Sequence, residues 1–292
     1  MSVPIGGWYV SKKLQFDEED SFGVTPSNPS YSQIGYNSLV NISAPTQLTP
    51  VLQPGSEDPQ LLLERGMDLY NIDINYRPFD TTFAKYGFNA QGGGTGTIDK
   101  SLSLAMSIAL GGSGETFIQA LGCRVGNIGI GGKAGGPITV KAKIACQNIP
   151  VPSTTVLPGS FATNPSTVPI QFKDGGAQPV SIGGSQYNVN SINIQCDRGL
   201  ERIPQPNSQI AQLIIPTTRR ITGTVGIVWL NTDNYARLAN DTPFTLTWTL
   251  KTGGSTLTLT GTRFRLLSSL SLTPESTVYE QYGFESLAGT LT

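Results

Sequence analysis

The sequence predicts a mostly β protein whose antiparallel sheets bury one face, and three observations support this fold class. Apolar residues alternate with small or polar ones at a period of two from about residue 66 onward, whereas helical periodicity is nearly absent. Glycine pairs separate the alternating segments, as expected of turns between strands. Hydrophobic residues make up 38% of the 292 residues and charged residues only 13%, so the chain can bury a core but carries little charge.

Residues 101–110 show the clearest alternation, with Leu102, Leu104 and Met106 on the apolar face. The opposite face holds only small residues, namely Ser101, Ser103, Ala105, Ser107 and Ala109. The same pattern predicts strands at 138–146, 191–196 and 244–250. Residues 256–260 alternate again after the Gly253-Gly254 turn, which predicts a hairpin.

Two short helices are predicted. Thr232 is a suitable N-cap for residues 234–238, and Pro274 suits the first helical position of residues 274–282. Both are short enough to lie at the end or flank of a sheet.

Composition divides the chain into five segments that form one assembly unit. Residues 1–65 are an N-terminal segment with a long Pro-rich loop, which from 17 to about 60 shows little periodicity. Residues 66–150 and 181–278 are β-rich halves, separated by an irregular connector at 151–180, and residues 279–292 form a C-terminal arm. Similar punctuation in the two halves indicates an internal duplication, although their sequences are not visibly alike.

The composition excludes most catalytic and binding classes. The chain contains no histidine, which removes Ser-His-Asp triads, Cys-His dyads and histidine metal sites. Three cysteines without a C-x-x-C pair favour neither a zinc site nor a disulfide scaffold. The net charge of -1 disfavours a nucleic-acid binder. We therefore predict no catalytic, metal or cofactor-binding residue. No apolar run is long enough for a membrane span, and the first residues lack signal-peptide features, so an intracellular start is expected.

Several short segments, in this order, resemble the tail tube (major tail) proteins of tailed bacteriophages. They are residues 18–26 (EEDSFGVTP), 117–123 (FIQALGC) with 125–128, 192–194, 199–202, 219–225, the 235–238 helix and the 244–250 strand. The resemblance implies a β-sandwich or partial barrel with one or two short flanking helices and long loops. It also implies a structural virion protein of the tail, not an enzyme. Its subunits would form hexameric or pseudo-hexameric rings that stack into a hollow conduit for the genome.

The resemblance further implies the partners and the location. The chain would associate with itself and with the tape measure, the terminator and the baseplate or tip, and DNA would pass only as non-specific cargo. Assembly would occur in the host cytoplasm. Because this chain is longer than the smallest members, a fused second tube domain would give a pseudo-six-fold ring from three chains.

For such a tube, the small-residue face from Ser101 to Ala109 is predicted to meet a neighbouring subunit or the lumen, because a Ser and Ala face is unusual in contact with water. The 17–60 loop and the C-terminal arm are predicted to contact the next ring. The aromatic candidates for those contacts are Phe22, Tyr31, Tyr279, Tyr282 and Phe284. A bore that releases DNA is expected to lack rows of cations such as Lys141, Lys143, Arg219 and Arg220.

Two alternatives remain open from the sequence. One is another ring component of a phage tail or head, such as a distal tail, terminator or decoration protein. The other is a non-viral β-sandwich adhesin or binding module, which would need secretion and an aromatic platform.

Overall fold

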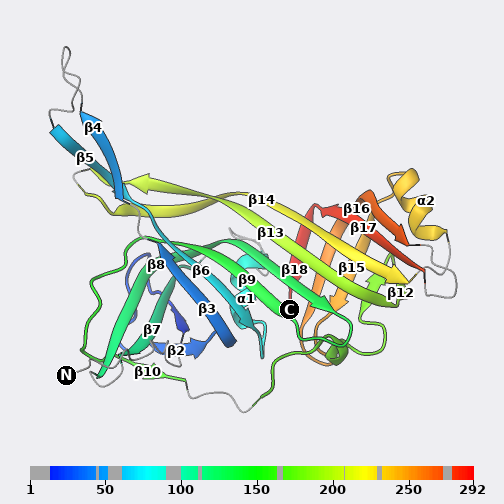
Figure 1. Cartoon of the computed structure of the whole chain (residues 1–292), viewed down its shortest axis with the longest axis horizontal. Coiled ribbons are helices and arrows are strands. Elements are labelled where there is room, and N and C mark those ends of the chain that lie inside the picture. The colour runs from blue at the N-terminus through cyan, green and yellow to red at the C-terminus, as the bar shows by residue number, and fades with distance from the viewer. Residues whose placement is uncertain are drawn as a thin grey trace, which may run out of the picture.

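The computed structural model describes residues 14–43, 46–51, 61–89, 100–110, 114–162, 167–206, 208–228, 232–271 and 278–292. One continuous antiparallel sheet runs the length of the molecule in the order β3-β6-β9-β8-β13-β14-β17-β16. Figure 1 shows β13 and β14 crossing from one end of the molecule to the other. The strands of this long sheet are β3 (Tyr36–Ser43), β6 (Tyr70–Arg77), β8 (Gly114–Lys133), β9 (Thr139–Cys146), β13 (Val189–Pro204), β14 (Ala211–Val228), β16 (Thr256–Ser271) and β17 (Tyr279–Ser286).

Two smaller sheets cover one face of the long sheet, one on each half. The first has the order β10-β2-β1-β7 and continues into the N-terminal part of β8. The second contains β12-β11-β15, the N-terminal part of β16, and β18. Their strands are β1 (Gln15–Glu18), β2 (Ser30–Gln33), β7 (Leu102–Leu110), β10 (Ser160–Phe161), β11 (Val180–Ile182), β12 (Ser185–Tyr187), β15 (Phe244–Thr249) and β18 (Ala288–Leu291). The core lies between the long sheet and these covers.

The remaining elements lie around this double sandwich. A 3-10 helix, Phe172–Gly175, lies within the 151–180 connector. Helix α1 (Thr82–Phe88) follows β6 and is buried, whereas α2 (Asp233–Ala239) follows β14 at one end of the molecule. Within the described part of the chain, β4 (Thr46–Val51) and β5 (Leu61–Asp68) pair only with each other, and this hairpin projects from the opposite end (Figure 1).

Strands β8 and β16 each belong to two sheets because each bends at a glycine. The bend residues are Gly122, with φ of 59°, and Gly261, with φ of 60°, a left-handed conformation that glycine adopts without steric cost. Before the bend each strand pairs in a covering sheet, and after it each pairs in the long sheet. The two bends therefore close the two sandwiches in the same way.

The order of elements is the same in both halves. The series β1-β2-β3-β6-α1-β7-β8-β9 is followed by β11-β12-β13-β14-α2-β15-β16-β17, with the same pairings in each. The irregularities repeat as well: β8 and β16 each have a bulge against the preceding strand and another just after the bend glycine. Val125 and Phe264 are equivalent, because each is the third residue after its bend glycine and is followed directly by a bulge.

The mostly β sandwich class is confirmed, with strands at 102–110, 139–146, 189–204 and 244–249. The helix expected at 234–238 is also present, as α2. Three expectations differ. Residues 279–292 are no arm, because β17 lies inside the long sheet between β14 and β16. The Pro-rich N-terminal segment contains the strands β1, β2, β3 and β4. Residues 279–282 of the second expected helix are strand, and residues 272–277 lie outside the described part.

Candidate assembly surface

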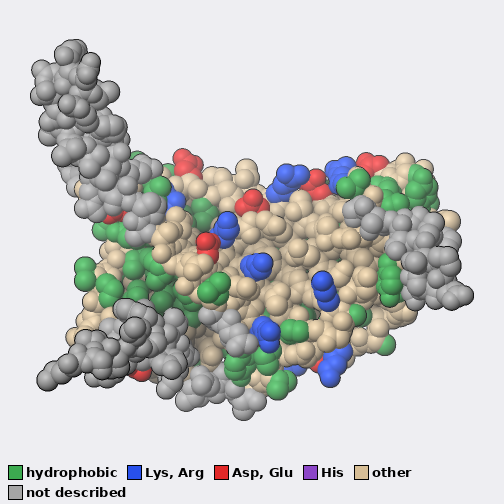
Figure 2. Space-filling model, in the orientation of Figure 1, with side chains coloured by type: hydrophobic (Ala, Val, Ile, Leu, Met, Phe, Trp, Pro, Cys, Tyr) green, Lys and Arg blue, Asp and Glu red, His purple; other side chains and the backbone are tan. Residues whose placement is uncertain are grey.

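The face of the long sheet that turns away from the core is broad, hollowed and mostly uncharged. Alternation places the even side of β6, for example Ile72 and Ile74, in the core and leaves the odd side exposed. A groove of about 1010 Å³ crosses β3, β6, β9, β8, β13, β14 and β17. Figure 2 shows this face as a wide uncharged surface with a few separate cationic side chains. The uncharged residues that line the groove include Asn41, Asn75, Asn127, Gly129, Gly131, Asn193, Gln195 and Thr224.

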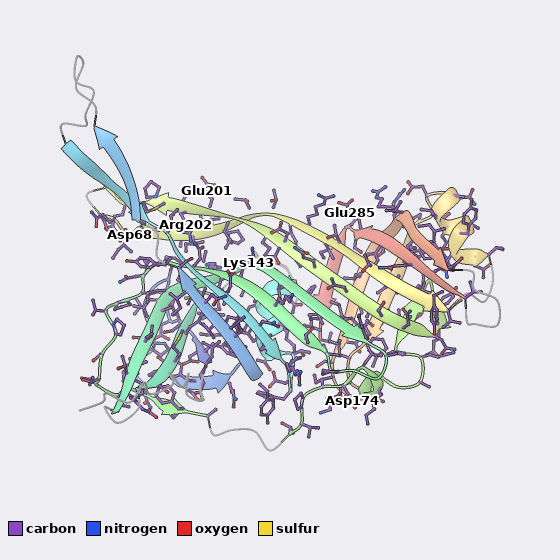
Figure 3. The ribbon with its side chains drawn as sticks, in the orientation of Figure 1. Asp68, Lys143, Asp174, Glu201, Arg202 and Glu285 are labelled. Atoms are coloured by element: carbon purple, nitrogen blue, oxygen red, sulfur yellow. The ribbon has the colours of Figure 1, made fainter. Side chains whose placement is uncertain are left out.

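The charges on this face differ between the two halves. On β9, Lys141 and Lys143 line the groove beside Asp73, and none of the three has an ion pair among the described residues. Figure 3 places Lys143 over the first half and Glu285 over the second. The second half differs, because Arg220, Arg263 and Arg265 on this face are in ion pairs.

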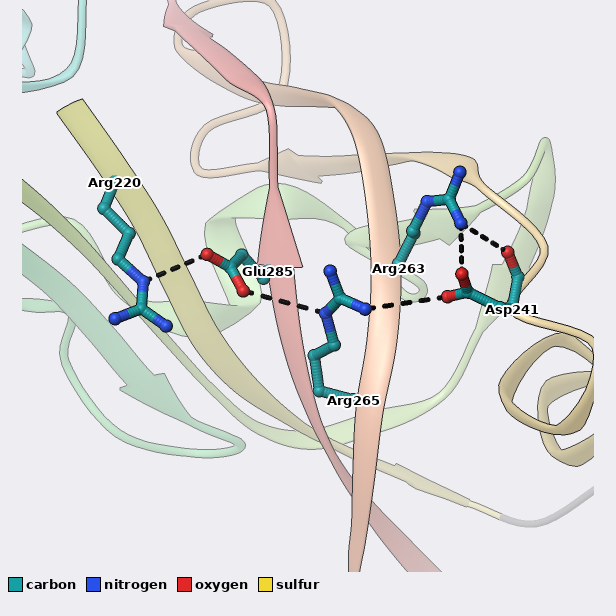
Figure 4. Close-up of polar contacts among 5 residues, drawn as sticks. All are labelled: Arg220, Asp241, Arg263, Arg265 and Glu285. Carbon is teal, nitrogen blue, oxygen red and sulfur yellow. Dashed lines mark hydrogen bonds and ion pairs between the residues drawn. The ribbon is translucent and has the colours of Figure 1, made fainter. Parts of the chain in front are cut away.

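Figure 4 shows that pairing as a row of alternating charge across β14, β17 and β16. Glu285 accepts from Arg220 at 3.0 Å and lies 3.6 Å from Arg265. Arg265 lies 3.7 Å from Asp241, which also pairs with Arg263. Exposed ion pairs contribute only about 0–1 kcal/mol each, so the row neutralises the face more than it stabilises the fold.

Both edges of the long sheet carry exposed apolar side chains. Leu39 and Ile42 on β3, and Leu266 on β16, are among the exposed large hydrophobic residues. Among the described residues, β3 pairs only with β6, and the Arg263–Ser271 part of β16 pairs only with β17. An apolar, unpaired strand edge is a site of association unless something covers it.

The two halves meet inside the chain through a junction of strands and a helix. Strand β8 pairs with β13 from Asn127 opposite Asp197 to Lys133 opposite Ser191. Beside this ladder, Asn89 at the end of α1 donates its side-chain NH₂ to Leu291 O at 3.2 Å, and Leu291 N donates to Asn89 Oδ1 at 2.8 Å. The helix of the first half is thus tied to the last strand of the second.

Arg198 of β13 strengthens this junction from below α1. Its guanidinium donates to Tyr86 O at 3.2 Å and to Asn89 O, which are carbonyls at the C-terminal end of the helix. A cation there satisfies terminal carbonyls and interacts favourably with the helix dipole. Burial lowers the pKa of Arg198, so the hydrogen bonds offset the cost of placing this charge in the interior.

A buried carboxylate holds the bend of β8. Glu19 accepts hydrogen bonds from Gly23 N at 2.8 Å and from Gly122 N at 2.7 Å. Burial raises the pKa of Glu19, although these backbone donors favour the charged form. The segment after β1 is therefore fixed to the bend. This could not be predicted from the sequence, because the run Asp17-Glu18-Glu19-Asp20 has the composition of a solvated turn.

The small-residue face of β7 packs inside the subunit, contrary to expectation. Ser101, Ser103, Ala105 and Ser107 are buried, while the side chain of Ala109 lies outside the described part. The Ser103 hydroxyl lies 2.9 Å from that of Thr25 and accepts from Gln119 at 3.2 Å. The partner of this face is the chain's own N-terminal segment, so the face lines no lumen.

Most of the expected ring-contact aromatics are also internal. Tyr31 is buried and stacks on Phe161. Tyr282 and Phe284 are buried in β17, where Tyr282 stacks on Phe264. Only Tyr279 is exposed and Phe22 half-buried, so two of the five candidates keep surface for another chain.

The described residues contain no grouping of three or more Cys, Asp or Glu side chains that could hold a metal ion. Cys123, Cys146 and Cys196 are buried free thiols. None of the described helices is long and apolar enough to cross a membrane.

Comparison with known proteins assigns the chain with this double sandwich to a protein family. The sequence model of the family described as phage tail tube protein matches residues 11–286. The chain belongs to the phage tail tube protein family. It is therefore a structural subunit of the virion tail that assembles with itself and other tail proteins into a tube, and this family is not a class of enzymes. Curated proteins give no match to the chain.

Proposed function

We propose that the exposed face of the long sheet lines the conduit of the tail tube, with the two covering sheets on the outside. The observation that carries this proposal is the hollowed, largely uncharged face, bounded by two unpaired edges. Copies joined edge to edge would extend this sheet into a closed wall without strand edges.

Strand geometry supports this orientation. The family resemblance implies six tube domains in a ring, and the repeated halves supply two from each chain, so three chains form one pseudo-hexameric ring. Three long sheets give roughly 24 strands, and a spacing of about 4.8 Å gives a wall radius of about 18–24 Å, depending on tilt. Covering sheets packed about 10 Å inside that wall would fill the bore. The covers must therefore face outward.

This orientation puts Lys141, Lys143 and Arg220 on the bore, contrary to the expected absence of cations there. Arg220 is balanced by Glu285, and the uncharged Asn127 and the exposed acid Asp197 lie between Lys143 and Arg220 in the cross-strand ladder. Scattered cations of this kind bind the phosphate backbone weakly because few counterions are released. DNA thus passes as non-specific cargo.

Rings stack through the projecting hairpin. Asp68 N donates to Gln209 O at 2.9 Å, so the tip of the β13–β14 hairpin holds the base of the β4–β5 hairpin. The partners at the ends of the tube are the tape measure, the terminator and the baseplate or tip, and assembly takes place in the host cytoplasm.

Cysteine accessibility in assembled tubes tests the orientation. Asn193→Cys places a thiol on the proposed bore, and Thr245→Cys places a matched thiol on the outer side of β15. In tubes, a bulky polymer-linked maleimide should label Thr245→Cys at least tenfold faster than Asn193→Cys, while dissociated subunits label at similar rates. Equal labelling in tubes would refute the orientation. Electron micrographs that show only single rings would favour a terminator or distal tail component.

A further inference from the structure

We infer that a second copy of this chain docks with its β3 strand against β16, in the register that β13 and β8 already have inside one chain. This inference rests on the proposed self-assembly and specifies its contact. The occupant is a second copy because the chain itself shows how its second half binds its first half.

The repeated pairings define which residues are equivalent. Strand β3 pairs Ile42 with Ile72, which pairs with Ile144 of β9. In the second half, Ile194 pairs with Gly223, which pairs with Phe284 of β17. Ile144 lies opposite Val125, and Phe284 lies opposite Phe264. Because Val125 and Phe264 are each three positions after a bend glycine, Ile144 and Phe284 are equivalent. Ile42 is thus the counterpart of Ile194.

Burial shows what the β3 edge lacks. Ile194 has 0% exposure because β8 and β14 lie on either side of β13, whereas Ile42 is 38% exposed. On the other edge, Leu267 is the counterpart of the fully buried Ile128 and is only partly buried. Each end of the chain is therefore missing the neighbour that the junction supplies to its counterpart.

The register between copies follows from the junction. Inside the chain, Gln195 lies opposite Gly129 and Asn193 opposite Gly131. The counterparts on β3 are Ser43 and Asn41. Ser269 and Ser271 are the counterparts of Gly129 and Gly131, since a bulge adds one residue to β16 between Leu267 and Ser269. Copies should then pair Ser43 with Ser269, and Asn41 with Ser271.

The helix contact repeats beside this ladder. Asn89 follows α1 and holds Leu291, and Asn240 follows α2 at the same position. In the first half, the bridges of Leu121 to Asn148 and of Phe117 to Ser153 put residues 148–153 in the place that β18 has in the second half. Leu291 has 1% exposure, whereas Val151 in the corresponding segment has 89%. Asn240 of one copy should therefore lie beside the 148–153 segment of the next.

Double-cysteine variants test the register with their own controls. The matched pairs are Ser43→Cys with Ser269→Cys, and Asn41→Cys with Ser271→Cys. The crossed pairs use the same residues, Ser43→Cys with Ser271→Cys and Asn41→Cys with Ser269→Cys. Directly opposed residues have Cα atoms about 4.5–5.5 Å apart, within disulfide range, whereas diagonal ones are about 7–8 Å apart. A link within one chain is excluded, since seven strand spacings separate the edges by about 34 Å.

Mild oxidation of assembled tubes should give covalent trimers from the matched pairs at least tenfold more than from the crossed pairs. The three native cysteines are buried, so oxidised wild-type tubes should contain no linked chains and give the background level. Tubes in which crossed pairs link equally well, or matched pairs fail to link, would overturn the register while leaving the tube function intact. Wild-type protein that forms no tubes or rings would instead contradict the proposed function.

A second pair of variants tests the edge without cross-linking. Ile42→Lys should fold normally and remain a dispersed subunit, because it places a charge where the next copy's β16 packs. Ile215→Lys, on β14 away from both edges, is the matched control at 39% exposure and should assemble as wild type. Normal tubes from Ile42→Lys would overturn the assignment of this edge.

Discussion

The bend of β8 should make Gly122→Ala among the most destabilising single-methyl changes in the chain. At a φ of 59°, alanine pays about 1–2 kcal/mol for the left-handed conformation. The new Cβ would also lie 2.5 Å from Gln147 Cβ and 3.0 Å from Phe22 Cζ, and overpacking of this kind costs about 1–3 kcal/mol. We expect the free energy of unfolding to fall by about 2–5 kcal/mol, measured by urea denaturation of the dissociated subunit.

Gly135→Ala separates the cost of the left-handed backbone from the cost of overpacking. Gly135 has a φ of 77°, and no heavy atom lies within 4 Å of an added Cβ, so only the backbone term applies and the loss should be about 1 kcal/mol. Gly261→Ala should fall between the two, since its Cβ meets the exposed Leu287 side chain at 2.7 Å. Equal losses for Gly122→Ala and Gly135→Ala would refute the packing constraint at the bend.

Three further measurements address the pH response, the stacking hairpin and the thiols. Because burial raises the pKa of Glu19, its contribution to stability is complete below the unfolded pKa of about 4.3 and is lost as pH rises through the folded value. The stability of wild type relative to Glu19→Gln should thus decrease from pH 4 to pH 7, by at most about 1.4 kcal/mol per pH unit, and an increase would contradict the burial. Joining Thr46 to Asp68, which pair directly, through an Asn-Gly turn should leave the melting temperature unchanged but abolish stacking; tubes of normal length would place the ring contact elsewhere. All three cysteines are buried and should react with a thiol reagent only after unfolding, so labelling of the native subunit would show an open core.

The strands with strict alternation could be predicted from the sequence because each buries one face. Strand β9 alternates exposed and buried positions along most of its length, as its residue types predict. Helix α1 could not be predicted in this way. Phe83, Ala84, Tyr86, Gly87 and Phe88 are buried, and only Thr82 is exposed and Lys85 half-buried. A helix of two turns with so narrow a polar side shows no clear amphipathic period.

The candidate site was less predictable because its partners are distant in sequence. The small face of β7 was predicted to meet another subunit or the lumen, but the residues that cover it, such as Thr25, belong to the same chain. Burial of Tyr282 and Phe284 follows from the order of strands, since the last segment of the chain inserts between β14 and β16. Neither local composition nor periodicity determines that order.

Joining two tube domains in one chain changes the energetics of ring closure. Each free body that associates loses translational and rotational freedom, at an estimated cost of about 4–15 kcal/mol. The pseudo-hexameric ring that we propose would close three contacts between molecules, while the β8–β13 junctions would already be formed within each chain. The β3–β16 contact can therefore be weaker than in a ring of six separate subunits and still close the wall. A weaker contact would suit these edges, where the described exposed apolar residues are Leu39, Ile42 and Leu266.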